Sequence, residues 1–154
     1  MRSMQEMISR SFCNVYGVCH NVSGRLLIII IMPMLTTAEI GRRGEDVAVG
    51  YLRSRGYMIC AQNWRSGRYE IDIVAERDGV THFVEVRARR AGSLLSPEAT
   101  INATKANAIR RAASAYIREC RIAGEVAFDL LAVDVFPDGN YDVRYVPDAV
   151  EFGW

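Results

Sequence analysis

Two short charged strings stand on either side of a predicted turn, and their residue types and spacing could support chemistry. They are residues 70–72 (Glu-Ile-Asp) and residues 85–87 (Glu-Val-Arg), with Asp78 and Gly79 between them. An Asp-Gly pair between alternating apolar runs is the strongest short-range signal for a β-hairpin. If Asp78 and Gly79 form the loop, Asp72 falls opposite Glu85 on one face of the sheet.

This pairing places two carboxylates close together. Directly opposed residues have Cβ atoms roughly 4.5–5.5 Å apart, and like charges at that distance weaken a hairpin. The pattern therefore predicts a divalent metal ion between Asp72 and Glu85, or else neutralisation by Arg87 or Arg89. Glu70 falls opposite Arg87, which predicts a cross-strand ion pair worth under about 1 kcal/mol if exposed. Such a pair would leave Arg87 less free to reach a phosphate.

Charge is unevenly distributed along the chain. From Arg42 to Arg121 there are 15 Arg and Lys against 9 Asp and Glu, whereas from Ile122 to Trp154 one Arg stands against seven acids. A basic middle suits a polyanion such as nucleic acid, and an acidic end does not. Charge alone therefore does not identify a nucleic-acid binder. Lys105 is the only lysine among the 19 basic residues and for that reason stands out.

The length of 154 residues suits one domain with its own core. The four cysteines form no C-x-x-C pair and no dense disulfide framework, which favours a reducing, cytoplasmic location. Cys13, Cys19 and His20 match no common zinc-site spacing.

Residues 1–35 differ in pattern from the rest, and we expect them to form an N-terminal extension before a domain of residues 36–154. Their run of seven apolar residues, 26–32, is far shorter than the ~20 needed to span a bilayer, so no membrane partner is predicted. Three interpretations remain open for the first 33 residues. Met34 is the true start, the segment is a mobile extension, or it is a signal peptide.

From residue 36 the periodicity predicts an α/β fold in the order α-β-β-β-α-β-β, a mixed sheet flanked by helices. The first helix is expected to have Thr37 as N-cap and to stop at Gly56. The second is expected over about 102–121, with Asn102 or Thr104 as N-cap. Its expected buried face comprises Ile109, Ala112, Ala113, Tyr116, Ile117 and Cys120. Strands are expected at 57–61, 70–76, 81–88, 126–135 and 141–146, with loops at 63–69 and 89–97 and a turn at 137–140.

Six motifs over about residues 36–150 resemble the YraN-type family. That family is similar in sequence pattern to Holliday-junction resolvases of the restriction-endonuclease-like fold. The motifs are GRRGEDVAVGYLRSRGY (41–57), NWR (63–65), EIDIVA (70–75), FVEVRAR (83–89), Lys105 and FDLLAV (128–133).

The resemblance implies a magnesium or manganese site with Glu45, Asp72 and Glu85 as ligands and Arg87 as a further catalytic residue. Magnesium prefers hard oxygen ligands and keeps several waters, so a few carboxylates and a phosphate oxygen suffice. Such an ion polarises phosphate and lowers the pKa of a bound water. The alternative interpretation is that Glu45 is an ordinary solvated residue in the first turns of its helix.

Three positions depart from the family pattern. Arg87 stands where lysine is usual; arginine can clamp a phosphate but cannot act as a base. Tyr69 stands where glycine is typical, and it either stacks on a nucleobase or crowds the site. Ala127 stands where an arginine often precedes the Phe-Asp pair, which removes one basic contact.

Basic residues near these motifs are candidates for binding nucleic acid: Arg65, Arg68, Arg89, Lys105, Arg110 and Arg111. Lys105 opens the second helix, where a bound phosphate would relieve its conflict with the helix dipole. An ordinary solvated lysine is the alternative. Trp64 is either a stacking platform for unpaired bases or part of the core.

Two functions remain open. One is a metal-dependent endonuclease acting on DNA, with branched or damaged DNA as candidate substrates. The other is a nucleic-acid-binding or partner-binding module that keeps the fold without turnover, which the three departures favour. A homodimer is expected only by analogy, since cutting both strands of a junction needs two sites.

Overall fold

The computed structural model describes residues 21–22, 25–26, 35–92 and 102–150. The chain divides into two units, residues 1–34 and 35–154. In the first unit, β1 (Asn21–Val22) pairs antiparallel with β2 (Arg25–Leu26). Most of the first 33 residues lie outside the described ranges, so all three interpretations of this segment stay predictions.

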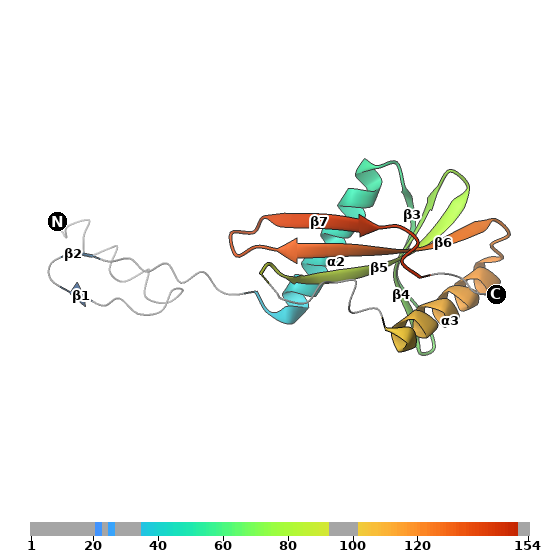
Figure 1. Ribbon diagram of the computed structural model, residues 1–154, viewed down its shortest axis with the longest axis horizontal. Coiled ribbons are helices and arrows are strands. Elements are labelled where there is room, and N and C mark those ends of the chain that lie inside the picture. The colour runs from blue at the N-terminus through green and yellow to red at the C-terminus, as the bar shows by residue number, and fades with distance from the viewer. Residues whose placement is uncertain (1–20, 23–24, 27–34, 93–101, 151–154) are drawn as a thin grey trace, which may run out of the picture. The chain divides into compact units, whose positions relative to one another are not determined.

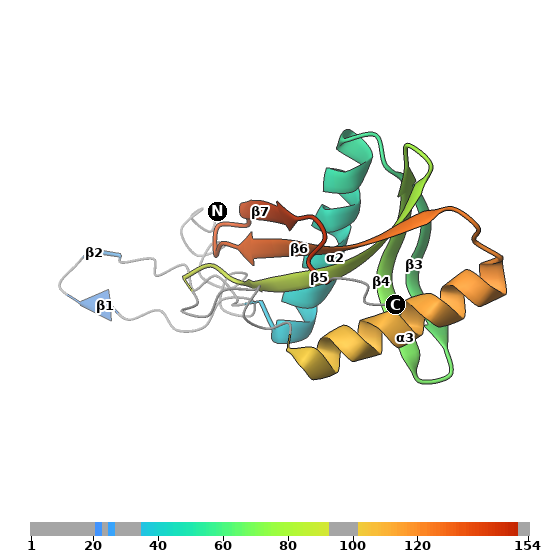
Figure 2. The same cartoon turned by 45° about the vertical axis from the view of Figure 1, so that its right-hand side comes forward.

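The described part of the second unit is a five-stranded mixed sheet with one helix on each face (Figures 1 and 2). The sheet order is β3-β4-β5-β6-β7, in which only β5 and β6 are parallel. The elements are α2 (Thr37–Ser54), β3 (Met58–Ser66), β4 (Tyr69–Arg77), β5 (Val80–Arg90), α3 (Ala103–Cys120), β6 (Glu125–Val135) and β7 (Tyr141–Val146). The predicted mixed α/β fold and its element order are confirmed.

The β4–β5 hairpin turns at the predicted residues. Asp78 and Gly79 both have positive φ, +52° and +81°, as a two-residue turn of this kind requires. Pairing then runs from Arg77 opposite Val80 to Ile73 opposite Val84 and follows the predicted register. It ends there, so the two predicted acid-containing pairs beyond this point are not among the paired residues.

Helix α2 begins one residue earlier than predicted. Thr36, not Thr37, is the N-cap, because only Thr36 has a glutamate three residues further on. The Thr36 hydroxyl accepts a hydrogen bond from the Glu39 N–H (3.2 Å), and the Glu39 carboxylate accepts one from the Thr36 N–H (2.7 Å). This reciprocal capping box satisfies two otherwise unpaired donors. Gly56, at φ +82°, follows the C-cap residue as expected.

Each helix covers its own apolar cluster. Ala48, Val49 and Leu52 of α2 pack on alternate residues of the sheet, and Ile109, Ala112, Ala113 and Tyr116 of α3 pack on the opposite face. Cys120, expected on the buried face of α3, is exposed in its last turn. Asn102 caps α3, its side-chain oxygen accepting from the Lys105 N–H (2.9 Å).

Two predicted loops are partly strand. Residues 63–66 belong to β3, and only Gly67 and Arg68 separate β3 from β4. The polar residues of this segment resemble a loop, but Trp64 packs under α3 opposite Ile71 and so continues the sheet. Arg89 and Arg90 likewise extend β5, because they pair with Asp134 and Val135 of β6. The rest of the predicted 89–97 loop lies mainly outside the described residues.

Candidate functional site

The fork between β4 and β5 begins where their pairing ends, at Ile73 and Val84. Strict alternation along β4 would place Ile71 and Ile73 on one face, yet Ile71 packs with the α3 cluster and Ile73 with the α2 cluster. The strand therefore changes face at Asp72. The Asp72 carboxylate lies in the fork, where its Oδ2 accepts a hydrogen bond from the Val86 N–H (2.8 Å).

Glu85 lies on the β5 side of this fork and is buried, with 8% of its surface exposed. Two cations meet its Oε1 atom: Lys105 Nζ from α3 at 2.8 Å, and the Arg87 guanidinium from the same strand at 3.1 Å. Both partner side chains are about one third exposed. Glu85 is therefore bound by two basic residues that are far apart in the sequence, Arg87 of β5 and Lys105 of α3.

Asp72 has an unusual protonation equilibrium. Burial raises its pKa from 3.8 to about 6, helped by the negative charge of Glu85 and, to a smaller degree, of Glu45. The hydrogen bond from Val86 and the charge of Lys105 act in the opposite direction. All three predicted metal ligands therefore interact electrostatically at Asp72. Carboxylates whose charges oppose one another in a buried site are typical of functional positions.

Asn63 is a site residue that the sequence reasoning missed. Its side-chain amide donates a hydrogen bond to Glu45 Oε2 (3.0 Å) and so joins β3 to α2. Asn63 also has a φ of +49°, a conformation that asparagine adopts more readily than most residues. The irregular backbone thus directs this amide toward Glu45, as strained residues often do at functional sites. The available signal was its position at the start of the NWR motif (63–65).

The predicted basic residues fall into two groups. Arg65 pairs with Glu70 on the next strand (2.7 Å), Arg89 pairs with Asp134 of β6, and Arg110 donates to the Asn107 side chain (3.1 Å). Glu70 therefore binds Arg65 and not the predicted Arg87, because β3 continues alongside β4 at this point. The other group, Arg68, Lys105 and Arg111, lines a groove.

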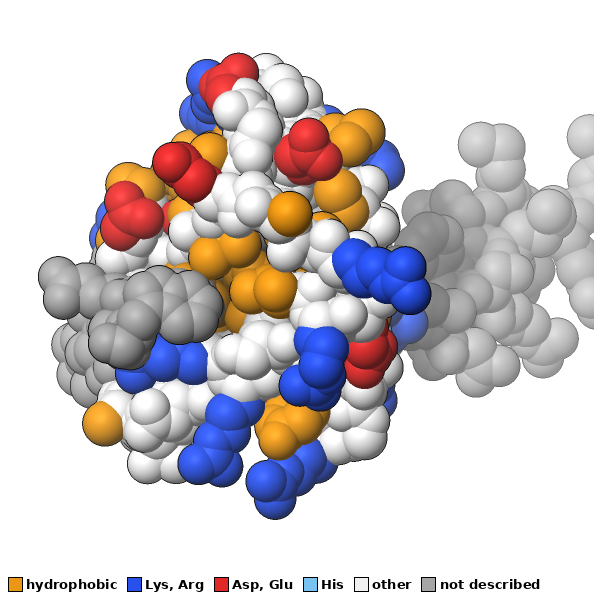
Figure 3. Space-filling model, turned by 90° about the vertical axis from the view of Figure 1, so that its right-hand side faces the viewer, with side chains coloured by type: hydrophobic (Ala, Val, Ile, Leu, Met, Phe, Trp, Pro, Cys, Tyr) orange, Lys and Arg blue, Asp and Glu red, His pale blue; other side chains and the backbone are white. Residues whose placement is uncertain are grey.

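The α3 groove lies between the β3–β4 turn and the first three turns of α3, and its volume is about 520 Å³. Tyr69 and Glu70 line it together with the three basic residues. Figure 3 shows that Lys and Arg side chains predominate on the lower part of the displayed face, over α3 and the β3–β4 turn. Lys105 belongs both to this groove and to the Glu85 contact, so the groove adjoins the fork.

The fork suits a magnesium or manganese ion in its donor chemistry. Asp72 and Glu85 supply hard oxygen atoms, and their mutual repulsion is the kind that a divalent cation relieves. Among the residues that the structure describes, no three Asp, Glu, His or Cys side chains form a ready-made metal cluster. Two carboxylates are compatible with magnesium, which is commonly held by one or two carboxylates plus water and phosphate.

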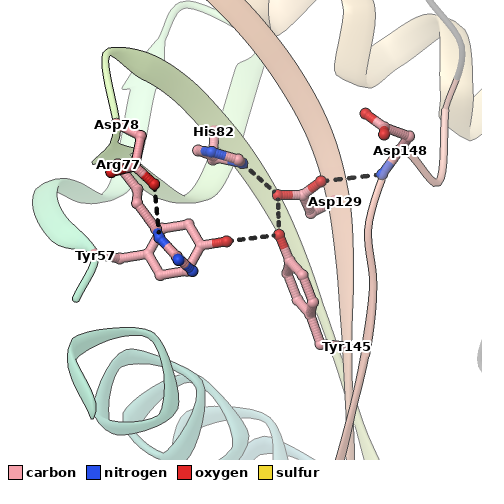
Figure 4. Close-up of polar contacts among 7 residues, drawn as sticks. All are labelled: Tyr57, Arg77, Asp78, His82, Asp129, Tyr145 and Asp148. Atoms are coloured by element: carbon pink, nitrogen blue, oxygen red, sulfur yellow. Dashed lines mark hydrogen bonds and ion pairs between the residues drawn. The ribbon is translucent and has the colours of Figure 1, made fainter. Parts of the chain in front are cut away.

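A second polar cluster lies on the α2 side of the sheet (Figure 4). The carboxylate of Asp129, only 3% exposed, contacts His82 Nδ1 (2.7 Å), the Tyr145 hydroxyl (2.6 Å) and the Asp148 N–H (3.1 Å). Tyr57 completes it by a hydrogen bond to Tyr145 (3.0 Å). Burial and these hydrogen bonds raise the pKa of Tyr145. The cluster ties β5, β6 and β7 to the segment after β7, which is a structural role.

Trp64 belongs to the core, one of its two predicted roles. Its ring meets Tyr116 edge to face with centroids 5.2 Å apart, within the cluster beneath α3. Helices of the described part include none that is both long and apolar enough to span a membrane.

The sequence is similar to one protein family over most of its length. Residues 44–133 match the model of a family described as "Uncharacterised protein family UPF0102". A UPF0102 protein of Porphyromonas gingivalis is 43% identical over 100 residues, which cover 65% of this chain and 74% of that protein. One of Bacteroides thetaiotaomicron is 36% identical over 72% of this chain and 91% of its own length. One of Dictyoglomus turgidum is 32% identical over 75% and 99% respectively.

The matched family segment contains the predicted site residues Glu45, Asp72, Glu85 and Arg87 as well as Lys105. The chain therefore belongs to the UPF0102 family, the YraN-type family that its motifs resemble.

Proposed function

We propose that this protein is a metal-dependent endonuclease that hydrolyses phosphodiester bonds in DNA, with branched or damaged DNA as candidate substrates. The observation that carries the proposal is the fork, where the partly buried Asp72 and the buried Glu85 repel each other next to two cations. Two acids that repel each other cost folding free energy unless a proton or a cation offsets the repulsion. Phosphodiester hydrolysis uses both the acids and the cations.

Each residue at or near the fork has its own role in this proposal. Asp72 and Glu85 would hold magnesium or manganese, with Glu45 adding negative charge and Asn63 orienting Glu45. When bound, the ion would polarise the phosphate and lower the pKa of a water molecule. Lys105 and Arg87 stabilise negative charge that develops on the phosphate. Arg87 supplies no base, since arginine stays protonated.

A binding module without turnover is the second candidate. It is favoured by the contacts of Glu85, whose Oε1 atom is already neutralised by Lys105 and Arg87. An acid that is satisfied by two side-chain cations needs no metal ion. In that case the groove and fork would bind a nucleic-acid backbone and release it unchanged.

Incubation with manganese and four DNA substrates distinguishes the two candidates. The substrates are supercoiled plasmid, a four-way junction, a flap and single-stranded DNA. The endonuclease proposal expects cleavage of at least one of them, and loss of that cleavage in Asp72→Asn. Glu76→Gln is the matched control, because Glu76 is an exposed acid on the same strand, away from the fork. Absence of cleavage with all four substrates, together with salt-sensitive binding, would leave the binding module.

Location and assembly belong to the same proposal. We propose a cytoplasmic location, because the four cysteines form no C-x-x-C pair and no dense disulfide framework. A homodimer would bring two forks to one junction. Sedimentation of the full chain with and without junction DNA tests that assembly.

A further inference from the structure

We propose that the α3 groove is a binding site for one unpaired nucleic-acid strand, which it leads to the fork. This inference rests on the proposed function, whose substrate class it specifies. Its basis is the composition, size and position of the groove.

Basic side chains outnumber acidic ones among the described residues that line the groove. Arg68 lies at the β3–β4 turn, Lys105 and Arg111 lie six residues apart on α3, and Glu70 is the one acid among the described lining residues. Arg65 pairs with Glu70 at 2.7 Å and offsets its charge. A groove of this sign attracts a polyanionic backbone and raises its local concentration.

An aromatic ring lines the same groove. Tyr69 is half-buried there, and the Arg68 guanidinium lies over its ring, 5.6 Å from the ring centre. Basic grooves with aromatic side chains bind single strands, because bases stack on the rings while the cations contact the phosphates. The bases of a duplex are already stacked on one another, so only an unpaired strand offers a free base face to Tyr69.

The size of the groove favours the same ligand. A volume of about 520 Å³ is typical of sites for small ligands. It suits a single nucleic-acid strand better than a double helix. Asn107 and Thr104 add polar side chains along the α3 wall. These groups can hydrogen-bond to sugars and phosphates without reading a sequence.

Lys105 connects the groove to the fork. It lines the groove and lies 2.8 Å from Glu85 Oε1, so a phosphate that leaves the groove at this end meets the acids next. A strand bound along α3 is thereby delivered to Asp72 and Glu85. This placement fits an enzyme or a binding module that acts where paired and unpaired DNA meet.

Fluorescence anisotropy with a labelled oligothymidylate and an equally long duplex tests the inference, in EDTA so that no cleavage occurs. We expect the single strand to bind the full chain more tightly than the duplex. Tyr69→Leu, which keeps apolar volume but removes the ring, should weaken single-strand binding at least about fivefold, and Tyr69→Phe should not. Arg111→Ala should weaken it and lower the salt dependence by about one phosphate contact.

Arg53→Ala is the matched control, since Arg53 is an exposed helical arginine on the opposite face of the sheet. Thermal melts of every variant show that it is folded. Equal or tighter binding of the duplex, or Tyr69→Leu and Arg111→Ala behaving like Arg53→Ala, would overturn the inference. The assay is independent of turnover: groove-dependent binding without cleavage under manganese removes only the endonuclease, whereas cleavage without single-strand preference removes only the groove.

Discussion

Lys105 Nζ lies 2.8 Å from Oε1 of Glu85, so the first turn of α3 supplies a cation to a buried acid on β5. The two residues are twenty positions apart, and the segment between them includes residues outside the described ranges. Arg87 contacts the same oxygen atom from the strand. The site therefore combines the planar guanidinium group of Arg87 with the compact ammonium group of Lys105.

Replacing Lys105 by methionine should raise the pKa of Asp72 further, because Lys105 is one of the two groups that lower it. Carboxyl-carbon NMR of Asp72 across the acidic pH range measures this midpoint. Lys105→Arg keeps the charge and should return the midpoint toward the wild-type value. A midpoint that is the same in Lys105→Met and wild type would show that the lysine does not act on Asp72.

Asp72 should make the fold less stable as the pH rises. Its folded pKa of about 6 lies above the ordinary 3.8, so the folded state binds the proton more tightly than the unfolded state. The resulting stabilisation is present below about pH 4 and is lost as the pH rises through about 6, on the order of 2–3 kcal/mol in all. Asp72→Asn mimics the neutral acid and can still accept the Val86 hydrogen bond.

Thermal unfolding against pH checks this expectation. Asp72→Asn should melt above wild type near about pH 8, and the two curves should converge near about pH 4. Glu76→Gln, on the same strand but exposed, should show no such divergence. An Asp72→Asn melting temperature below that of wild type at neutral pH would contradict the assigned burial and repulsion.

Magnesium or manganese should stabilise the wild-type protein at neutral pH. A ligand that binds only the folded state at about 100 times its Kd contributes about 2.7 kcal/mol. The melting temperature should rise with metal in wild type and in Glu76→Gln but not in Asp72→Asn or Glu85→Gln, which lack one of the paired charges. The same rise in all four proteins would locate the ion elsewhere.

Gly44 sets the distance between α2 and β5. A Cβ atom added at Gly44 would lie 2.1 Å from the Ala88 Cβ, which is closer than any real contact. Gly44→Ala should therefore destabilise the fold by about 1–3 kcal/mol in urea unfolding, despite the better helix propensity of alanine. The displaced helix would also move Glu45, the next residue, away from Asn63.

The double variant Gly44→Ala/Ala88→Gly tests the assigned contact. The nearest obstructing atom is then gone, and the remaining neighbours are the Ala88 Cα at 3.4 Å and the Val133 Cβ at 3.8 Å, which are ordinary contacts. Most of the lost stability should return, apart from a glycine penalty in β5. Gly50→Ala, a helical position with open space around it, is the control that should not destabilise. Additive losses in the double variant would exclude the steric explanation.

Local patterns were sufficient for most elements. The Asp78–Gly79 turn set the β4–β5 register, and Asn102 and Gly56 marked one helix start and one helix stop. These features depend on neighbours within a few residues, so the sequence displays them directly. The predicted end of β3 was wrong because the polar residues there alternate with Trp64, whose burial depends on α3.

Motifs and periodicity were enough to predict the family, the element order and the candidate acids Asp72 and Glu85, since these are local properties of the chain. Three features became visible only in the folded chain: β4 and β5 separate after Ile73 and Val84, Asn63 binds Glu45, and Lys105 reaches Glu85. Strand separation depends on twist and packing across the whole sheet, and the Lys105 contact depends on how α3 docks against it. Such long-range geometry is the sum of many weak interactions and has no signature in adjacent residues.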